Sequence, residues 1–124
     1  MNKNKQKYLE ERLLNFSLSV LKLVKSLSKT DENKIYGKQI IRSSSSIGAN
    51  YSEAVFAHTK QDFIHTLNIS RKEAGETVYW LKLLRHVNKQ KADKITEIID
   101  ENEQILRIFI SSVKTGKENL QNGK

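Results

Sequence analysis

The periodicity of apolar residues is the feature that most constrains how this chain can fold. Between residues 8 and 28, apolar side chains recur at alternating steps of four and three positions. Residues at this spacing share one face of an α-helix, so the pattern predicts a long amphipathic helix over residues 8–28. This face consists of Leu9, Leu13, Phe16, Val20, Leu23 and Leu27. Further apolar residues between Leu14 and Val24 widen it, so we expect contact with more than one neighbour, in the same chain or in a second copy.

The same periodicity continues through three later segments, at residues 33–58, 60–86 and 91–113. The chain contains no proline and only five glycines, so few residues interrupt a helix. Long amphipathic helices joined by short connections pack side by side in opposite directions. We therefore expect an all-α fold, an antiparallel up-down four-helix bundle formed by one domain over residues 1–124, with residues 114–124 as a flexible tail.

Polar residues mark the expected helix ends. Thr30 or Asp31 can cap the second helix. Thr59, followed three positions later by Asp62, is a capping pattern for the third helix. Gly116 fits a stop for the fourth helix.

A run of four serines, Ser43 to Ser46, has two interpretations. Serine competes with helical hydrogen bonding and is common in linkers. However, Ile40 and Ile47 keep the helical phase across the run, which favours a continuous helix. Small side chains allow close approach, so we expect the tightest helix contact of the bundle at this position.

Composition excludes several classes of protein. There is no cysteine, which rules out disulfides and thiolate chemistry. No apolar run is long enough to span a bilayer, and the basic N-terminus lacks the apolar stretch of a signal peptide, so we expect a cytoplasmic protein without membrane contact. Lys and Arg number 22 against 14 Asp and Glu, and this net charge of +8 favours an anionic partner.

Acidic and polar residues share faces of the second and third expected helices. Helical spacing relates Ser46, Asn50, Glu53, Glu73 and Glu76 within their two segments. One hypothesis is a metal site or an acid–base pair inside the bundle. The other is a structural polar network that fixes helix packing, with Arg42, Ser46 or Arg71 as donor.

The histidine positions favour the second of these hypotheses. Di-iron bundles need a histidine three residues after a glutamate on two helices, and none of the three histidines has that spacing. The sequence also lacks a glycine-rich phosphate loop, a zinc signature and a nucleophile elbow. We therefore expect a structural network, no metal or cofactor, and no catalytic residue.

Basic residues form two stripes at helical spacing. The candidates for contact with nucleic acid are Lys22, Lys25 and Lys29 in the first stripe, and Arg71, Lys82, Arg85 and Lys89 in the second. Phosphates require only positive charge, so either stripe can contact a nucleic-acid backbone. The alternative is a solvated face whose late basic residues complement the helix dipole. No helix-turn-helix pattern occurs, so we do not expect sequence-specific DNA recognition.

Two segments carry a recognisable family pattern. The first is Ser46-Ile47-x-x-Asn50-x-x-Glu53, and the second places Phe63, Ala74, Glu76 and Leu81 along the next helix. With these motifs the chain resembles the bacterial four helix bundle protein family, first noticed as open reading frames in intervening sequences of large-subunit ribosomal RNA genes. The match extends from about Leu9 to Phe109.

The resemblance has implications beyond the fold. It implies a homopentamer of up-down bundles, in which Asn50, Glu53 and Glu76 are structural signature residues. It also implies similarity to the accessory variability protein of diversity-generating retroelements, a basic protein that works with nucleic acid and a reverse transcriptase. The resemblance thus implies a reverse transcriptase or another protein as a partner.

Three functional hypotheses follow. The first, which we favour, is a non-enzymatic oligomeric bundle that binds RNA or DNA by charge as an accessory factor. The second is a scaffold or protein-interaction module whose basic faces are only solvated. The third is an enzyme that uses Glu53, Glu73 and Glu76 around a metal.

Overall fold

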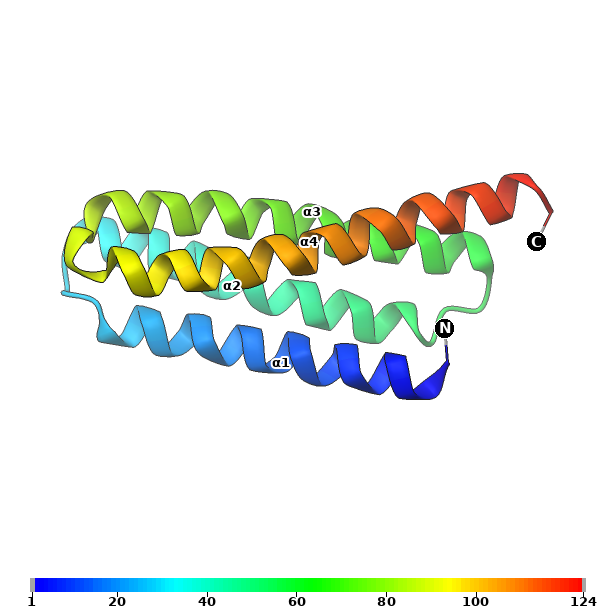
Figure 1. Ribbon diagram of the computed structural model, residues 1–124, viewed down its shortest axis with the longest axis horizontal. Helices are drawn as coiled ribbons and strands as arrows, with labels where there is room; N and C mark the ends of the chain where they lie inside the picture. The colour runs from blue at the N-terminus through cyan, green and yellow to red at the C-terminus, as the bar shows by residue number, and fades with distance from the viewer. Residues whose placement is uncertain (1, 124) are drawn as a thin grey trace.

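Four long helices account for most of residues 2–123, the part of the chain that the computed structural model describes (Figure 1). The elements are α1 (Lys3–Ser26), α2 (Asp31–Ala54), α3 (Lys60–Val87), a short 3-10 helix η1 (Lys89–Lys91) and α4 (Ala92–Gln121). Successive helices run in opposite directions, which confirms the predicted all-α, antiparallel up-down four-helix bundle. Within residues 2–123, no helix is both long enough and apolar enough to cross a membrane.

The bundle core consists of the faces that periodicity predicts. All six residues of the first predicted face are buried, and the matching faces of the other helices meet them. Tyr51 of α2 and Phe109 of α4 are buried in the core and pack edge to face, with ring centroids 5.9 Å apart. Burial of such side chains contributes roughly 1.5–3 kcal/mol each, which is why the helices hold together despite their high charge.

The small-residue face of α2 packs closely on both neighbouring helices. A Cβ atom added at Gly48 would lie 3.4 Å from the side chain of Leu13 in α1. Nearby, the Ser17 hydroxyl donates to the backbone oxygen of Ser44 at 3.1 Å. On the other side, the Ser70 hydroxyl of α3 donates to a backbone oxygen of α2 at 2.9 Å. The serine run is therefore continuous helix, and its small side chains let hydroxyl groups bridge between helices.

Threonine caps begin the second and third helices as predicted. Thr30 accepts a hydrogen bond from the Asn33 backbone at 3.2 Å, and Thr59 accepts one from the Asp62 backbone at 3.0 Å. The first helix begins earlier than residue 8, because Asn2 caps it by accepting from the Lys5 backbone at 2.8 Å. The second helix ends at Ala54 instead of 58, so a short irregular connection precedes α3.

The fourth helix differs most from its prediction. It continues to Gln121 instead of ending at 113, so residues 114–121 are helical and Gly116 is not a stop. A Cβ atom at Gly116 would lie 2.8 Å from Ile64 Cγ1, so the glycine lets α4 pass closely along the first turns of α3. The predicted tail also included Lys124, and the predicted domain began at Met1. Both residues lie outside the described part of the chain.

A buried pair of amides joins the first turn of α2 to the C-cap of α3 at one end of the bundle. Asn33 Nδ2 donates to Asn88 Oδ1 at 2.9 Å, and Asn88 Nδ2 donates to Asn33 Oδ1 at 2.7 Å. Both side chains are at least 95% buried. Asn33 Nδ2 also donates to the Ser28 backbone oxygen, and Asn88 Nδ2 donates to the Leu84 backbone oxygen, both at 2.9 Å. This pair holds the α1–α2 connection against the end of α3.

Candidate functional site

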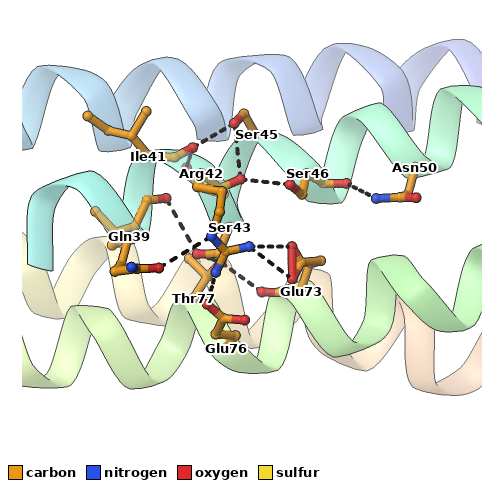
Figure 2. A network of polar contacts seen from close by, with 12 residues as sticks. Gln39, Ile41, Arg42, Ser43, Ser45, Ser46, Asn50, Glu73, Glu76 and Thr77 are labelled. Atoms are coloured by element: carbon orange, nitrogen blue, oxygen red, sulfur yellow. Dashed lines mark hydrogen bonds and ion pairs between the residues drawn. The ribbon is translucent and has the colours of Figure 1, made fainter.

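Arg42 of α2 forms the centre of a polar cluster on the surface between α2 and α3 (Figure 2). Its Nη1 atom donates to Glu73 Oε2 at 3.1 Å, and its Nη2 atom donates to Glu76 Oε2. Trp80 Nε1 donates to the same Glu76 oxygen at 2.8 Å. The Arg42 side chain is about half exposed, at 48%. One cation thus compensates two carboxylates on the neighbouring helix, in contact with solvent.

The structure brings part of the predicted polar set together. Arg42 joins Glu73 to Glu76, whereas Arg71, also proposed as a donor, donates to Asn68 of its own helix. Ser46 donates to the Arg42 backbone at 2.8 Å, and Asn50 donates to the Ser46 backbone at 2.8 Å.

Glu53 is placed differently from the rest of this set. Its side chain is exposed near the end of α2, and no ion pair joins it to another described residue. Its position one turn beyond Asn50 suggested a shared face, but the helix turns this carboxylate toward solvent. The network therefore contains fewer of the predicted residues than helical spacing indicated.

A contact between two hydroxyl groups beneath this cluster was not anticipated from the sequence. Thr77 donates to the Ser43 hydroxyl at 2.8 Å, and both residues are fully buried. The available signal was that Ser43, Ser70 and Thr77 occupy core positions of their periodic faces, where a hydroxyl needs a partner. Among the described residues, no group of three or more His, Asp or Glu side chains is arranged to hold a metal ion.

The up-down topology gathers the basic stripes at one end of the bundle. The end of α1, the start of α2, the end of α3 and the start of α4 meet there, at the left of Figure 1. Residues 20–41 and 79–97 form this region, which we call the basic end, and contain ten Lys and Arg against four Asp and Glu. The candidates Lys22, Lys25, Lys29, Lys82 and Lys89 are exposed there, and Arg85 is half-buried. Arg71 lies earlier in α3, outside this region.

Two hollows on the basic end are lined by lysines. One, of about 390 Å³, lies between α1 and α4 and includes Lys22, Lys91 and Lys94 in its wall. The other, of about 320 Å³, lies between α1 and α2 and includes three more lysines. These are Lys29, Lys34 and Lys38. The helical spacing that defined the two stripes did not include Lys34, Lys38, Lys91 and Lys94. Pairing the ends of antiparallel helices would have placed them beside the predicted stripes.

Comparison with known proteins identifies the family. Residues 9–111 match the profile of the 23S rRNA-intervening sequence protein family. The chain belongs to this family. The match spans almost the same range as the resemblance carried by the second- and third-helix motifs, which is thereby confirmed.

A solved structure supports the assignment to the 23S rRNA-intervening sequence proteins. It is a crystal structure from Bacteroides thetaiotaomicron, described as a protein with unknown function from the S23 ribosomal protein family. The two chains are 38% identical and superpose with a TM-score of 0.78, covering 89% of this chain and 98% of that one. A search of curated proteins finds no match. The family is thus linked to an intervening sequence of ribosomal RNA, and its function is unknown.

Proposed function

We propose that this protein is a non-enzymatic accessory factor that binds the phosphate backbone of RNA or DNA through the basic end. The observation that carries the proposal is the position of Lys91 and Lys94, at the N-cap and in the first turn of α4. A helix N-terminus carries partial positive charge, so cations there oppose helix stability. Complementing the dipole explains Lys25 in the last turn of α1, but it does not explain these two.

The surroundings of the hollows add to this argument. Lys22 lies with Lys91 and Lys94 around one hollow, so like charges approach one another across the α1–α4 boundary. Closely spaced like charges repel, and a polyanion that releases its counterions on binding offsets that repulsion. Lys94 also lies 3.6 Å from Glu97, an exposed pair that contributes little and leaves the local excess positive.

The experiment is a titration of a labelled RNA and of a labelled DNA of equal length, followed by fluorescence anisotropy at several salt concentrations. We expect the logarithm of the binding constant to fall linearly with the logarithm of salt concentration. The test variant replaces Lys22, Lys25 and Lys29 with glutamine. Its slope should be smaller by roughly two to three, since each lost phosphate contact removes about 0.7–0.9.

A matched control removes the same number of charges at the other end of the bundle. Lys60, Lys114 and Lys117 are all exposed there, and glutamine at these positions should leave the slope nearly unchanged. The absence of binding by the wild type at low salt would refute the proposal. Equal losses in the test and control variants would refute the assignment to the basic end.

Self-association is a second candidate property, and the outer face of α1 favours it. Leu14 and Leu18 lie one helical turn apart and are 60% and 53% exposed. Together they form an exposed apolar patch, and such patches favour a contact with another protein. We propose a homo-oligomer in which a second copy covers them, as the family resemblance to a homopentamer implies. Light scattering tests this, and a monomer at micromolar concentration, unaltered by Leu18→Lys, would refute it.

A further inference from the structure

Gly75 is the one helical glycine within residues 2–123 for which packing inside the chain gives no reason. A Cβ atom added at Gly37, Gly48 or Gly116 would lie 2.9, 3.4 or 2.8 Å from a side chain of another helix. At Gly75 the same atom would have nothing within 4 Å. Glycine destabilises a helix interior relative to alanine, so its presence here indicates that something outside the chain approaches closely.

An exposed aromatic ring lies one turn beyond this glycine. Tyr79 is 58% exposed, and its ring packs edge to face against Trp80 with centroids 5.5 Å apart. Trp80 is held in turn by its hydrogen bond to Glu76 and by Tyr36 at 6.1 Å. Side chains on a helix lean toward its N-terminus, so the Tyr79 ring lies toward the turn that contains Gly75. The ring is thus held in place beside the open space at Gly75, which we call the notch.

The charges around the notch are positive. Lys72 lies three residues before Gly75, and Lys82 lies three residues after Tyr79, so both share this side of α3. Both lysines are exposed. The nearby carboxylates of α3 belong to the cluster around Arg42, on the side that faces α2. The notch therefore suits a ligand with a planar body and negative charges on either side.

We propose that Gly75 and Tyr79 form a stacking site for one base of a single-stranded nucleic acid, whose flanking phosphates contact Lys72 and Lys82. This rests on the function proposed above and specifies its substrate as single-stranded. A base in a duplex is stacked on its neighbours and hydrogen-bonded to its partner, so it cannot cover the ring. The absence of a side chain at residue 75 gives the base room to lie against the helix.

The test compares a single-stranded and a double-stranded oligonucleotide of the same length, with three variants. Tyr79→Ala should weaken single-strand binding about tenfold, within the range for loss of one stacked base, and change duplex binding less than about twofold. Tyr79→Phe keeps the ring and should bind as the wild type does. Gly75→Gln fills the notch and should weaken single-strand binding while raising the urea midpoint, because glutamine favours a helix.

The Gly75→Gln variant separates binding from folding, since it is expected to be more stable and yet bind less well. Trp80, the single tryptophan, provides an independent signal. Its fluorescence should change when a single strand binds the wild type and remain constant in Gly75→Gln.

Two results would overturn this inference. The first is wild-type affinity in both Tyr79→Ala and Gly75→Gln while the variant at Lys22, Lys25 and Lys29 is weakened; the proposed function then stands without the stacking site. The second is an equal loss of single-strand and duplex binding in Tyr79→Ala. If the wild type binds neither oligonucleotide at low salt, the proposed function itself fails.

Discussion

The buried pair of Asn33 and Asn88 permits a quantitative test of what holds the basic end together. Alanine at residue 88 removes three hydrogen bonds, two shared with Asn33 and one to the Leu84 backbone. Each contributes about 1 kcal/mol net, and the Asn33 carbonyl oxygen left behind in a buried site adds a cost of about 1–3 kcal/mol. Because such contributions do not add fully, we expect Asn88→Ala to lower the free energy of unfolding by about 3 kcal/mol.

A double-mutant cycle measures the coupling free energy between the two amides and gives a more specific test. Asn33→Ala should cost a similar amount, since it also removes three hydrogen bonds. The double variant loses the two shared bonds only once and leaves no unsatisfied partner. It should therefore be more stable than the sum of the single effects predicts, by about 2 kcal/mol.

Urea unfolding followed by circular dichroism, at one fixed protein concentration, measures all four free energies. Asn119→Ala serves as a control, because Asn119 is an exposed asparagine of α4 and its loss should change stability by less than about 0.5 kcal/mol. Additive single effects would refute the reasoning, because they would mean that the two amides do not depend on each other. A loss below about 1 kcal/mol for Asn88→Ala would refute it as well.

Three further predictions concern other parts of the bundle. Gly116→Ala should lower the free energy of unfolding in urea by about 1–2 kcal/mol, because the new methyl group meets Ile64. Arg42→Met should cost less than about 1 kcal/mol in the same assay, because the Arg42 guanidinium is half exposed and its ion pairs are screened by salt. Burial, and to a lesser degree the charge of Glu10, raises the pKa of Tyr51. The unfolded chain therefore loses this proton first, so stability should fall as pH rises above about 10, less steeply in Tyr51→Phe than in the wild type.

Periodicity predicts the core because burial on a helix is a local property of the sequence. Leu13, Val20 and Leu23 recur at fixed steps, and those steps decide which side chains lie inward before any partner is known. The positions of helix ends also depend on contacts between residues that are far apart in the sequence. Gly116 is a typical stop signal, but its contact with Ile64 makes it a packing residue, and this contact exists only once α3 and α4 lie side by side.

The types of residue in the candidate site could be predicted from the sequence, but their arrangement in space could be predicted only in part. Helical spacing placed Glu73 and Glu76 together, yet it also placed Glu53 with them, because spacing does not specify how far a helix is rotated about its axis. The basic end illustrates a different limit. Lys34 and Lys91 are far apart in sequence and belong to no continuous stripe, and only the topology brings them to the same end.

Arginine and lysine have separate roles in this structure. Arg12 binds Glu101 through two parallel hydrogen bonds of 2.8 and 2.7 Å, which join α1 to α4 and raise the Arg12 pKa, and Arg42 binds two carboxylates of α3. Arg85 donates to Thr96 across the α3–α4 boundary. The planar guanidinium suits such fixed geometry, whereas a lysine ammonium acts as a mobile point charge.

The exposed cations of the basic end are nearly all lysines. A surface of point charges attracts phosphates without imposing a geometry on the bases, so it favours affinity that depends on salt and tolerates many sequences. Any preference among nucleic acids must then come from another contact. The stacking site at Tyr79 supplies one, because it selects for an accessible base and not for its identity. Salt dependence and strand preference should therefore respond to different substitutions, the first to lysines and the second to Tyr79 and Gly75.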